Sequence, residues 1–193
     1  MAPNSSAPAV TIVLLNWNSK VDTLECLESV FRLRYDNYNV VLCDNESTDG
    51  SVEAFKQWAD GHLQVTPASE TFSGEFAAPR TEAVVAWREF SREQSEAVEP
   101  DVPIARLTLI RTGGNLGFAG GNNVGIRFAI KHLAPDFVWL LNTDTLADPE
   151  ALSALVTRAM LGRDIGIVGS TLVYYWRPSR APAQTAKGTC ARG

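Results

Sequence analysis

The chain has 193 residues, which is the length of one domain or of one domain with a large insertion. Hydrophobic residues make up 45% and charged residues 20%, a composition that excludes disordered and fibrous proteins. With 17 basic and 22 acidic residues, the formal net charge of −5 argues against a nucleic-acid-binding protein.

The sequence indicates neither membrane insertion nor secretion. No apolar run approaches the roughly 20 residues that a membrane-spanning helix needs. The first nine residues are polar and do not resemble a secretory signal. The three cysteines are too few and too scattered for a disulfide framework or a zinc site. We therefore expect a cytoplasmic protein, with peripheral contact to the inner face of the membrane as an additional option.

The first half of the chain opens with two short apolar runs, Val10–Leu15 and Val40–Cys43. Runs of this kind, rich in β-branched residues, are typical of parallel strands that are buried on both faces. Between them, apolar residues at helical spacing predict a helix over Lys20–Leu33. A second, short helix is predicted after Gly50, and His62–Val65 is a candidate third strand.

The next stretch, at about residues 66–104, is rich in proline, glutamate and serine. We predict that it is an insertion on the surface of the domain. Within it, Val84, Trp87 and Phe90 have helical spacing, which predicts a charged helix over Thr81–Glu96.

The second half continues to alternate strands with helices. Strands are predicted at Leu107–Ile110, Phe137–Leu141, Ile165–Val168 and Thr171–Tyr175, and helices over Asn122–His132 and from Asp148 onward, where Pro149 suits the first turn. Such alternation predicts an α/β fold with a Rossmann-like, mostly parallel sheet flanked by helices. We expect residues 1–193 to form a single domain.

Polar segments follow four of the predicted strands. They are Asn16–Asn18, Asp44–Gly50, Gly113–Asn123 and Asn142–Thr145. Ligands of open parallel sheets bind beyond the carboxyl ends of the strands, so these four segments should meet at one crevice.

Two carboxylates in these segments are candidates for ligand binding. Asp144 directly follows a buried strand and can hold Mg²⁺ or Mn²⁺ together with substrate phosphates, or it can cap the turn before the next helix. Asp44 can accept a hydrogen bond from a nucleobase N–H, or it can cap its own loop.

The glycine-dense segment Gly113–Asn123 lets the backbone approach an anionic ligand at a helix N-terminus, or it is a turn that requires positive φ angles. It contains neither G-x-G-x-x-G nor a phosphate-binding loop with Lys-Ser/Thr. Both absences weaken the dinucleotide-dehydrogenase and nucleoside-triphosphatase alternatives.

Taken together, these motifs resemble the family 2 glycosyltransferases of the GT-A fold. The resemblance is carried by Val10–Asn18, Asp44–Ser51, Gly114–Asn123 and Leu141–Thr145, in that order. The third segment is similar to the loop of a rhamnosyltransferase-like branch. The fourth resembles that branch's form of the D-x-D metal motif, with Asn142 at the first acidic position.

The resemblance implies inverting transfer of a sugar, with rhamnose as an expectation, from a dTDP- or UDP-sugar to a glycan or lipid-linked acceptor. It also implies Mg²⁺ or Mn²⁺ as cofactor. Carried over by position, the implied site residues are Asn16, Asn18 and Asp44 around the nucleobase and ribose, Asn115, Gly117 and Asn122 along the donor cleft, and Asp144 on the metal with Asn142 beside it.

The family's acceptor half, with its catalytic base, has no counterpart that we identify in this sequence. We therefore expect a donor-binding half whose C-terminal acceptor region is missing, and a homo-oligomer formed through apolar surface near Val168–Trp176. The alternatives are an inactive nucleotide-binding remnant, an NAD-binding oxidoreductase and a non-enzymatic interaction module.

Overall fold

The computed structural model describes residues 7–65, 84–97, 104–162, 164–173 and 182–184. None of the helices in these ranges has the length and apolar character that crossing a bilayer requires. Most of the predicted insertion, residues 66–83 and 98–103, lies outside the described residues, as do residues 174–181 and 185–193.

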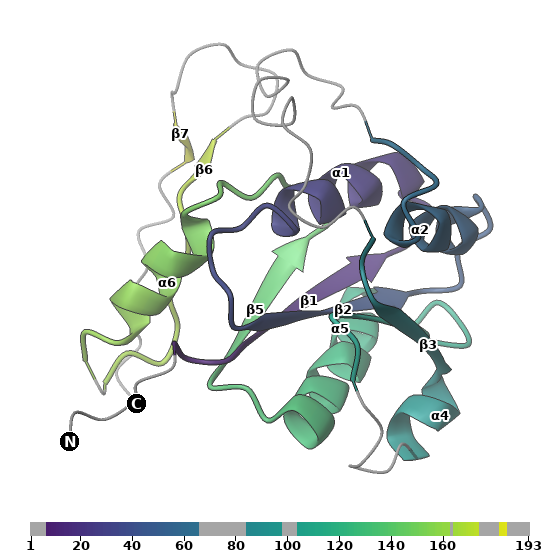
Figure 1. Cartoon of the computed structure of the whole chain (residues 1–193). Helices are drawn as coiled ribbons and strands as arrows, with labels where there is room; N and C mark the ends of the chain where they lie inside the picture. Colours follow the sequence, from purple (N-terminus) through teal and green to yellow (C-terminus); the bar gives the residue numbers. More distant parts are fainter. Residues whose placement is uncertain (1–6, 66–83, 98–103, 163, 174–181, 185–193) are drawn as a thin grey trace.

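Five parallel strands form the central sheet in the order β3-β4-β2-β1-β5 (Figure 1). The strands are β1 Val10–Asn16, β2 Tyr38–Asp44, β3 Trp87–Ser91, β4 Leu107–Arg111 and β5 Phe137–Asn142. From β1 the chain adds β2, then β3 at the outer edge and β4 between β3 and β2, and finally β5 on the other side of β1. This order confirms the predicted α/β fold with a Rossmann-like, mostly parallel sheet.

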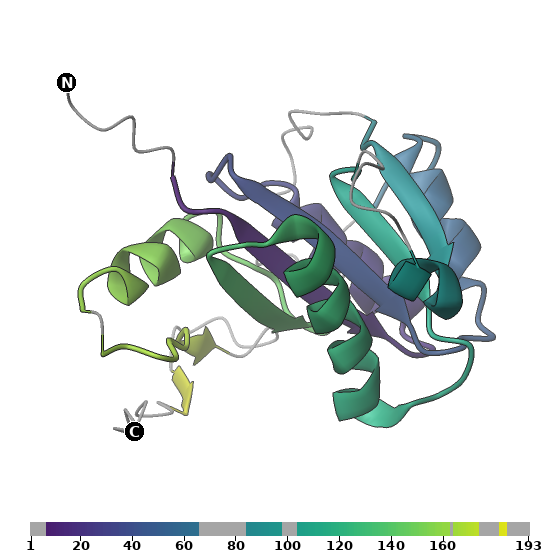
Figure 2. The same ribbon diagram turned by 90° about the horizontal axis from the view of Figure 1, so that it is seen from below.

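Helices cover both faces of this sheet (Figure 2). They are α1 Lys20–Val30, α2 Ser51–Ala59, α4 Arg92–Ala97, α5 Gly117–Phe128, the π-helical turn η1 Ala129–Leu133, and α6 Ala151–Ala159. Helices α1, α2 and α6 pack with one face and α5 packs on the other. A separate antiparallel pair consists of β6 Leu172–Val173 and β7 Pro182–Gln184.

The two central strands explain the uninterrupted apolar runs in the sequence. Alternate residues of β1 and β2 pack toward α1 and α2, and the residues between them pack toward α5. The first set includes Ile12, Leu14, Val40 and Leu42, and the second Val13, Val41 and Cys43. Since both faces are covered, both sets must be apolar.

The close approach of α5 to the sheet explains the spacing of its glycines. A Cβ atom at Gly121 would lie 2.4 Å from Leu15 Cδ1, and one at Gly125 would lie 2.7 Å from Val13 Cγ1. These two glycines therefore let the helix backbone pack against β1. The helix begins at Gly117, five residues before the predicted start, so most of the glycine-dense segment is helical.

The predicted helix over Thr81–Glu96 is wrong for residues 87–91, which form strand β3, whereas residues 92–96 are helical as part of α4 and residues 81–83 lie outside the described residues. The strand β3 pairs with β4 along its whole length, and Trp87 and Phe90 pack on opposite faces of the sheet instead of forming one stripe. Strand hydrogen bonds to β4 outweigh a helical spacing that rested on three apolar residues. Helix α4 begins only after Ser91, where the Ser91 N–H donates to Gln94 Oε1 and the Gln94 N–H donates to Ser91 Oγ.

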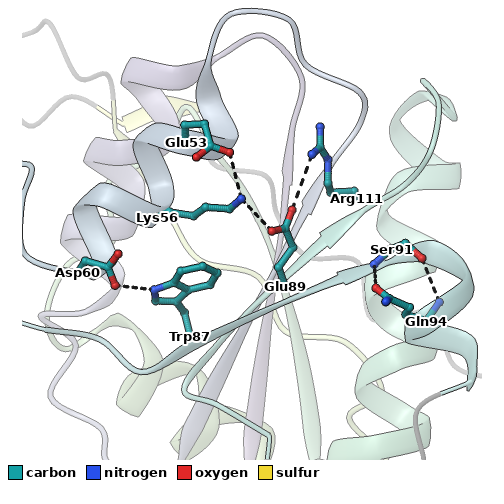
Figure 3. A network of polar contacts seen from close by, with 8 residues as sticks. All are labelled: Glu53, Lys56, Asp60, Trp87, Glu89, Ser91, Gln94 and Arg111. Atoms are coloured by element: carbon teal, nitrogen blue, oxygen red, sulfur yellow. Dashed lines mark hydrogen bonds and ion pairs between the residues drawn. The ribbon is translucent and has the colours of Figure 1, made fainter.

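Polar contacts tie β3 to α2 and to β4 (Figure 3). The Glu89 carboxylate accepts a hydrogen bond from Lys56 Nζ at 2.8 Å, and it lies 3.8 Å from Arg111 Nη1. The indole N–H of Trp87 donates to Asp60 Oδ1 at 2.8 Å. Partial burial disfavours the charged Lys56 ammonium, but Glu89 and Glu53 together outweigh this effect and raise the pKa of Lys56.

Two predicted strands are absent from the described residues. His62–Val65 instead closes the end of α2, where the His62 and Leu63 N–H groups both donate to Gln57 O. Ile165–Val168 is irregular and pairs with no described strand. The predicted strand over Thr171–Tyr175 is found only as β6, and residues 174 and 175 lie outside the described residues.

We predict that Gly125→Ala destabilises the domain by about 1–3 kcal/mol, because the added methyl group would overpack the contact between α5 and β1. Gly114→Ala is the matched control, since a Cβ there has nothing within 4 Å. Urea unfolding followed by circular dichroism measures both variants. Equal midpoints for the two variants would contradict the packing role of Gly125.

Candidate functional site

The side chain of Asn16 joins three parts of the carboxyl edge of the sheet. It is fully buried, and its Nδ2 donates to Asp44 Oδ1 at 2.8 Å and to Ser47 Oγ at 2.9 Å. Thr23 Oγ1, from α1, donates to its Oδ1 at 2.8 Å. Both amide N–H groups are therefore used within the protein, so the structure makes Asn16 a residue that positions Asp44 and its loop.

Asp44 lies at the end of β2 and is only 1% exposed. Its Oδ1 accepts the hydrogen bond from Asn16, and its Oδ2 accepts the Ser47 N–H at 3.0 Å. Of the two alternatives left by the sequence, the structure shows loop capping. Each carboxylate oxygen can accept a second hydrogen bond, so a ligand contact is compatible with this capping.

Asn18 fixes the opposite side of the same loop. Its φ angle is +49°, in the left-handed region that asparagine tolerates better than most residues. The Thr48 N–H donates to its Oδ1 at 2.7 Å, and its own N–H donates to Ser47 Oγ at 2.9 Å. The segments that follow β1 and β2 thus hold each other in place.

Asp49 completes the loop by capping two helices at once. Its carboxylate accepts hydrogen bonds from the Lys20 N–H at the start of α1 and from the Ser51 N–H at the start of α2, each at 3.0 Å. It also accepts a hydrogen bond from the Ser51 hydroxyl. Burial opposes ionisation of this carboxyl, but the hydrogen bonds from Ser51 and Lys20 outweigh it and lower the pKa of Asp49. The charge stabilises two helix N-termini.

Asn45 connects this loop to the glycine-dense segment, a role that sequence reasoning missed. Its Nδ2 donates to Asn115 Oδ1 at 3.1 Å and to Gly117 O at 3.2 Å, and its Oδ1 accepts the Leu116 N–H at 3.1 Å. Asn115 and Gly117 are exposed, and Gly117 has a φ angle of +68°. The only sign of this role in the sequence is that Asn45 is a polar residue directly after Asp44.

Asn122 lies one turn into α5 and is 6% exposed. Its Nδ2 donates to Phe118 O at 2.9 Å, four residues earlier in the same helix. This hydrogen bond holds the side chain against the first turn of α5, close to the start of the helix.

Asp144 and Asn142 differ from the other candidates because their side chains are exposed and unengaged. Within the part of the chain that the structure describes, neither side chain has a hydrogen bond or ion pair to the protein. The residue between them, Thr143, is buried and donates to Leu15 O at 3.3 Å, which anchors the turn to β1. Asp148 Oδ1, rather than Asp144, accepts an N–H at the start of α6, from Glu150.

The Asp144 and Asn142 side chains at the end of β5 suit a cation whose remaining ligands come from a bound diphosphate. No group of three His, Cys, Asp or Glu side chains capable of holding a metal occurs among the described residues. One carboxylate and one amide oxygen nevertheless fit Mg²⁺ or Mn²⁺ if phosphate oxygens and water supply the remaining positions. Metal and diphosphate would then bind together.

Two aromatic side chains at this edge are exposed, and sequence reasoning did not assign them to the site. Trp17 lies between Asn16 and Asn18 and is 56% exposed, and Phe118 in the first turn of α5 is 66% exposed. An exposed ring beside these polar side chains offers a face for stacking. The sequence signal was the position of Trp17 directly after a buried strand.

The two buried thiols near this edge are not nucleophiles. Burial, aided by the charge of Asp144, raises the pKa of Cys26. Burial also raises the pKa of Cys43 to about 12, with a smaller contribution from Asp44 and an opposing hydrogen bond from Gly125. Both groups therefore remain protonated near neutral pH.

Comparison of the structure with known structures identifies the class of fold. The chain is similar to the mannosyltransferase PcManGT from Pyrobaculum calidifontis, solved in complex with GDP-Man and Mn²⁺. The TM-score is 0.54 at 20% sequence identity, over 84% of this chain and 35% of that chain. This likeness confirms the GT-A fold that the sequence predicts.

Comparison of the sequence supports the family. Residues 11–83 match the sequence model described as Glycosyl transferase family 2. The chain is 34% identical over 55 residues to the putative glycosyltransferase EpsE of Bacillus subtilis (strain 168), a match that covers 28% of this chain and 20% of that protein. It is 42% identical over 48 residues to the low-salt glycan biosynthesis hexosyltransferase Agl10 of Haloferax volcanii, over 25% of this chain and 16% of that protein.

The matched segments thus span a fifth or less of the length of these curated relatives. The sequence match over residues 11–83 and the fold thus make this chain similar to glycosyltransferases of family 2.

We predict that Asn16→Ala lowers the free energy of unfolding by about 1–3 kcal/mol. The substitution would leave the buried Thr23 hydroxyl and an oxygen of the buried Asp44 carboxylate without their hydrogen-bond partner. The control is Asn142→Ala, at the end of the neighbouring strand, where the side chain is exposed; we expect a change within about 0.5 kcal/mol. Urea unfolding measures both. A loss at Asn142 as large as that at Asn16 would contradict the assigned difference between them.

Proposed function

We propose that this chain binds a nucleoside-diphosphate sugar together with Mg²⁺ or Mn²⁺, as the donor-binding part of a family 2 glycosyltransferase. The observation that carries the proposal is the exposed carboxylate of Asp144, which lies unpartnered among the described residues at the end of a parallel strand. Asn16, Asn18, Asp44 and Asp49 are already held by hydrogen bonds within the protein. Asp144 therefore offers this edge an exposed carboxylate that is free to bind a ligand, with the exposed Asn142 beside it.

In this proposal the nucleobase and ribose bind between the loops after β1 and β2. Asp44 has spare lone pairs for a base N–H or a ribose hydroxyl. Asn18, in the loop after β1, binds the loop that follows Asp44 through the Thr48 N–H. The exposed indole of Trp17 offers a face on which the base can stack. Asn16 acts beneath them, because it fixes the position of Asp44.

The diphosphate then lies between the start of α5 and the end of β5. Asn115, Gly117 and Asn122 are assigned to the α5 side of this cleft. The N-terminus of a helix of 12 residues carries partial positive charge that favours phosphate oxygens. On the β5 side, Asp144 would hold the cation with Asn142 beside it, and the cation would neutralise charge on the departing nucleoside diphosphate.

No carboxylate at this edge is assigned as catalytic base. Inverting transfer needs a group that takes the proton of the acceptor hydroxyl. Asp44 and Asp49 are engaged in hydrogen bonds that fix the loop, and Asp144 is assigned to the cation. The proposal for these residues is therefore donor binding. Transfer to a glycan or lipid-linked acceptor, and rhamnose as the sugar, belong to the proposal for the whole enzyme.

We predict that the chain binds one of dTDP, UDP and GDP in the presence of Mn²⁺, and that Asp144→Ala weakens this binding about tenfold or more, or by about 1.4 kcal/mol. Isothermal titration calorimetry measures the affinities with and without Mn²⁺. Because the chain supplies one carboxylate, Mn²⁺ alone should bind far more weakly than Mn²⁺ with the nucleotide.

Asp36→Ala is the control for this experiment, since Asp36 is exposed and lies two residues before the amino end of β2, at the opposite end of the strand from Asp44. It should bind nucleotide like the unmodified chain. Binding that is indifferent to Mn²⁺ and to Asp144→Ala would remove Asp144 from the metal site. Binding of NADH in place of all three nucleotides, without metal, would support the oxidoreductase alternative.

A further inference from the structure

The guanidinium group of Arg111 is an unused hydrogen-bond donor at the carboxyl edge of the sheet. Arg111 is the last residue of β4, and its side chain is 50% exposed. Within the part of the chain that the structure describes, its side chain makes no hydrogen bond. Lys20, at the start of α1, differs because its Nζ donates to Asp49 O at 3.0 Å. Arg111 therefore offers this edge a positive charge and free N–H groups.

Glu89 lies beside Arg111 without binding it tightly (Figure 3). One oxygen of the Glu89 carboxylate accepts a hydrogen bond from Lys56 Nζ at 2.8 Å, while the other lies 3.8 Å from Arg111 Nη1. A separation of 3.8 Å is too long for a hydrogen bond. Glu89 thus keeps the guanidinium near the end of β4, and Lys56 is its stronger partner.

The pairing of β2 with β4 places Arg111 next to Asp44. The two residues are partners in the register of these parallel strands, whose spacing is about 4.8 Å. Two residues earlier, the partners Leu42 and Leu109 both pack into the core beneath α1 and α2. Because side chains alternate along a strand, Asp44 and Arg111 belong to the same face of the sheet. A carboxylate and a guanidinium are thus carried by adjacent strands.

The order of the strands relates Arg111 to the proposed ligand, so the inference rests on the proposed function. There, the diphosphate lies at the end of β5 and the base lies between the loops after β1 and β2. Phosphates, ribose and base follow one another in a nucleotide, and β4 is the next strand beyond β2. Arg111 therefore lies on the side of the base that faces away from Asp144.

We propose that Arg111 donates a hydrogen bond to a carbonyl oxygen of the nucleobase, and that the donor nucleotide accordingly carries uracil, thymine or guanine. In these bases the ring N–H that Asp44 can accept lies next to an exocyclic carbonyl oxygen. A hydrogen bond from a guanidinium to that oxygen is strengthened by the positive charge.

Cytosine and adenine reverse both groups. Their ring nitrogen at the corresponding position is an acceptor, and the neighbouring exocyclic group is an amino donor. Asp44 would then face an acceptor and Arg111 would face a donor. Unpaired polar groups at a binding site reduce affinity, so Asp44 and Arg111 together select against these two bases.

Isothermal titration calorimetry of the full chain with Mn²⁺ tests the proposal. The keto nucleotides are UDP, dTDP and GDP, and the amino nucleotides are CDP and ADP. We expect at least one keto nucleotide to bind about tenfold or more tightly than both amino nucleotides. UDP and CDP are a matched pair, because they differ only in the base edge that Asp44 and Arg111 would contact.

Arg111→Met should reduce this preference to about threefold or less, because methionine retains much of the side-chain length but donates no hydrogen bond. The matched control is Arg88→Met. Arg88 is exposed on the neighbouring strand β3 and pairs in register with Thr108 instead of Arg111. It should keep the preference of the unmodified chain. The preference is a ratio of two affinities of one variant, so a partly unfolded sample does not change it.

The outcomes separate this inference from the proposed function. Mn²⁺-dependent binding of keto and amino nucleotides with equal affinity would overturn the role of Arg111 and leave the proposed donor site standing. The same holds for a preference that Arg111→Met leaves unchanged. A folded chain that binds none of the five nucleotides would overturn both.

Discussion

The buried amide of Asn16 is the interaction on which the candidate site depends. It joins the end of β1 to α1 through Thr23 and to the loop after β2 through Asp44 and Ser47. A buried amide with satisfied donors is stable, whereas one unsatisfied group in the same place costs about 1–3 kcal/mol. The chain therefore holds these three segments in one arrangement.

Around this centre, the loops are fixed by side chains that bind backbone groups of their neighbours. Asp49 caps α1 and α2, and Asn45 connects the loop after β2 to the start of α5. Loops that are fixed in this way need little reordering when a ligand binds. Such preorganisation lowers the entropic cost of binding. Asp144 stands apart because it is carried on an anchored turn while its own carboxylate stays free.

The two outer strands of the described sheet differ in charge. Ion pairs tie β3 to its neighbours, whereas β5 carries no charged side chain. Arg111 ends the strand next to β3, and Asp144 lies two residues beyond β5. A cation and a carboxylate thus flank the candidate site at one edge of the sheet.

Much of the fold was predictable because its signals are local. The apolar runs that became β1, β2, β4 and β5 must be buried on both faces, and the polar segments after them necessarily lie at one edge of a parallel sheet. The candidate site residues could be located from this rule and from family resemblance. Strand β3 could not, since its five residues form a strand only through pairing with β4.

The sequence by itself determined the class of fold, the edge of the sheet that carries the polar residues and the family that these residues resemble. Only the tertiary structure decided which of them are free. Asn16 and Asp44 are held in place by a hydrogen bond between residues 28 positions apart, while the carboxylate of Asp144 is exposed to solvent. The physical reason is that hydrogen-bond partners distant in the chain are chosen by the packing of strands and helices, which no local pattern records.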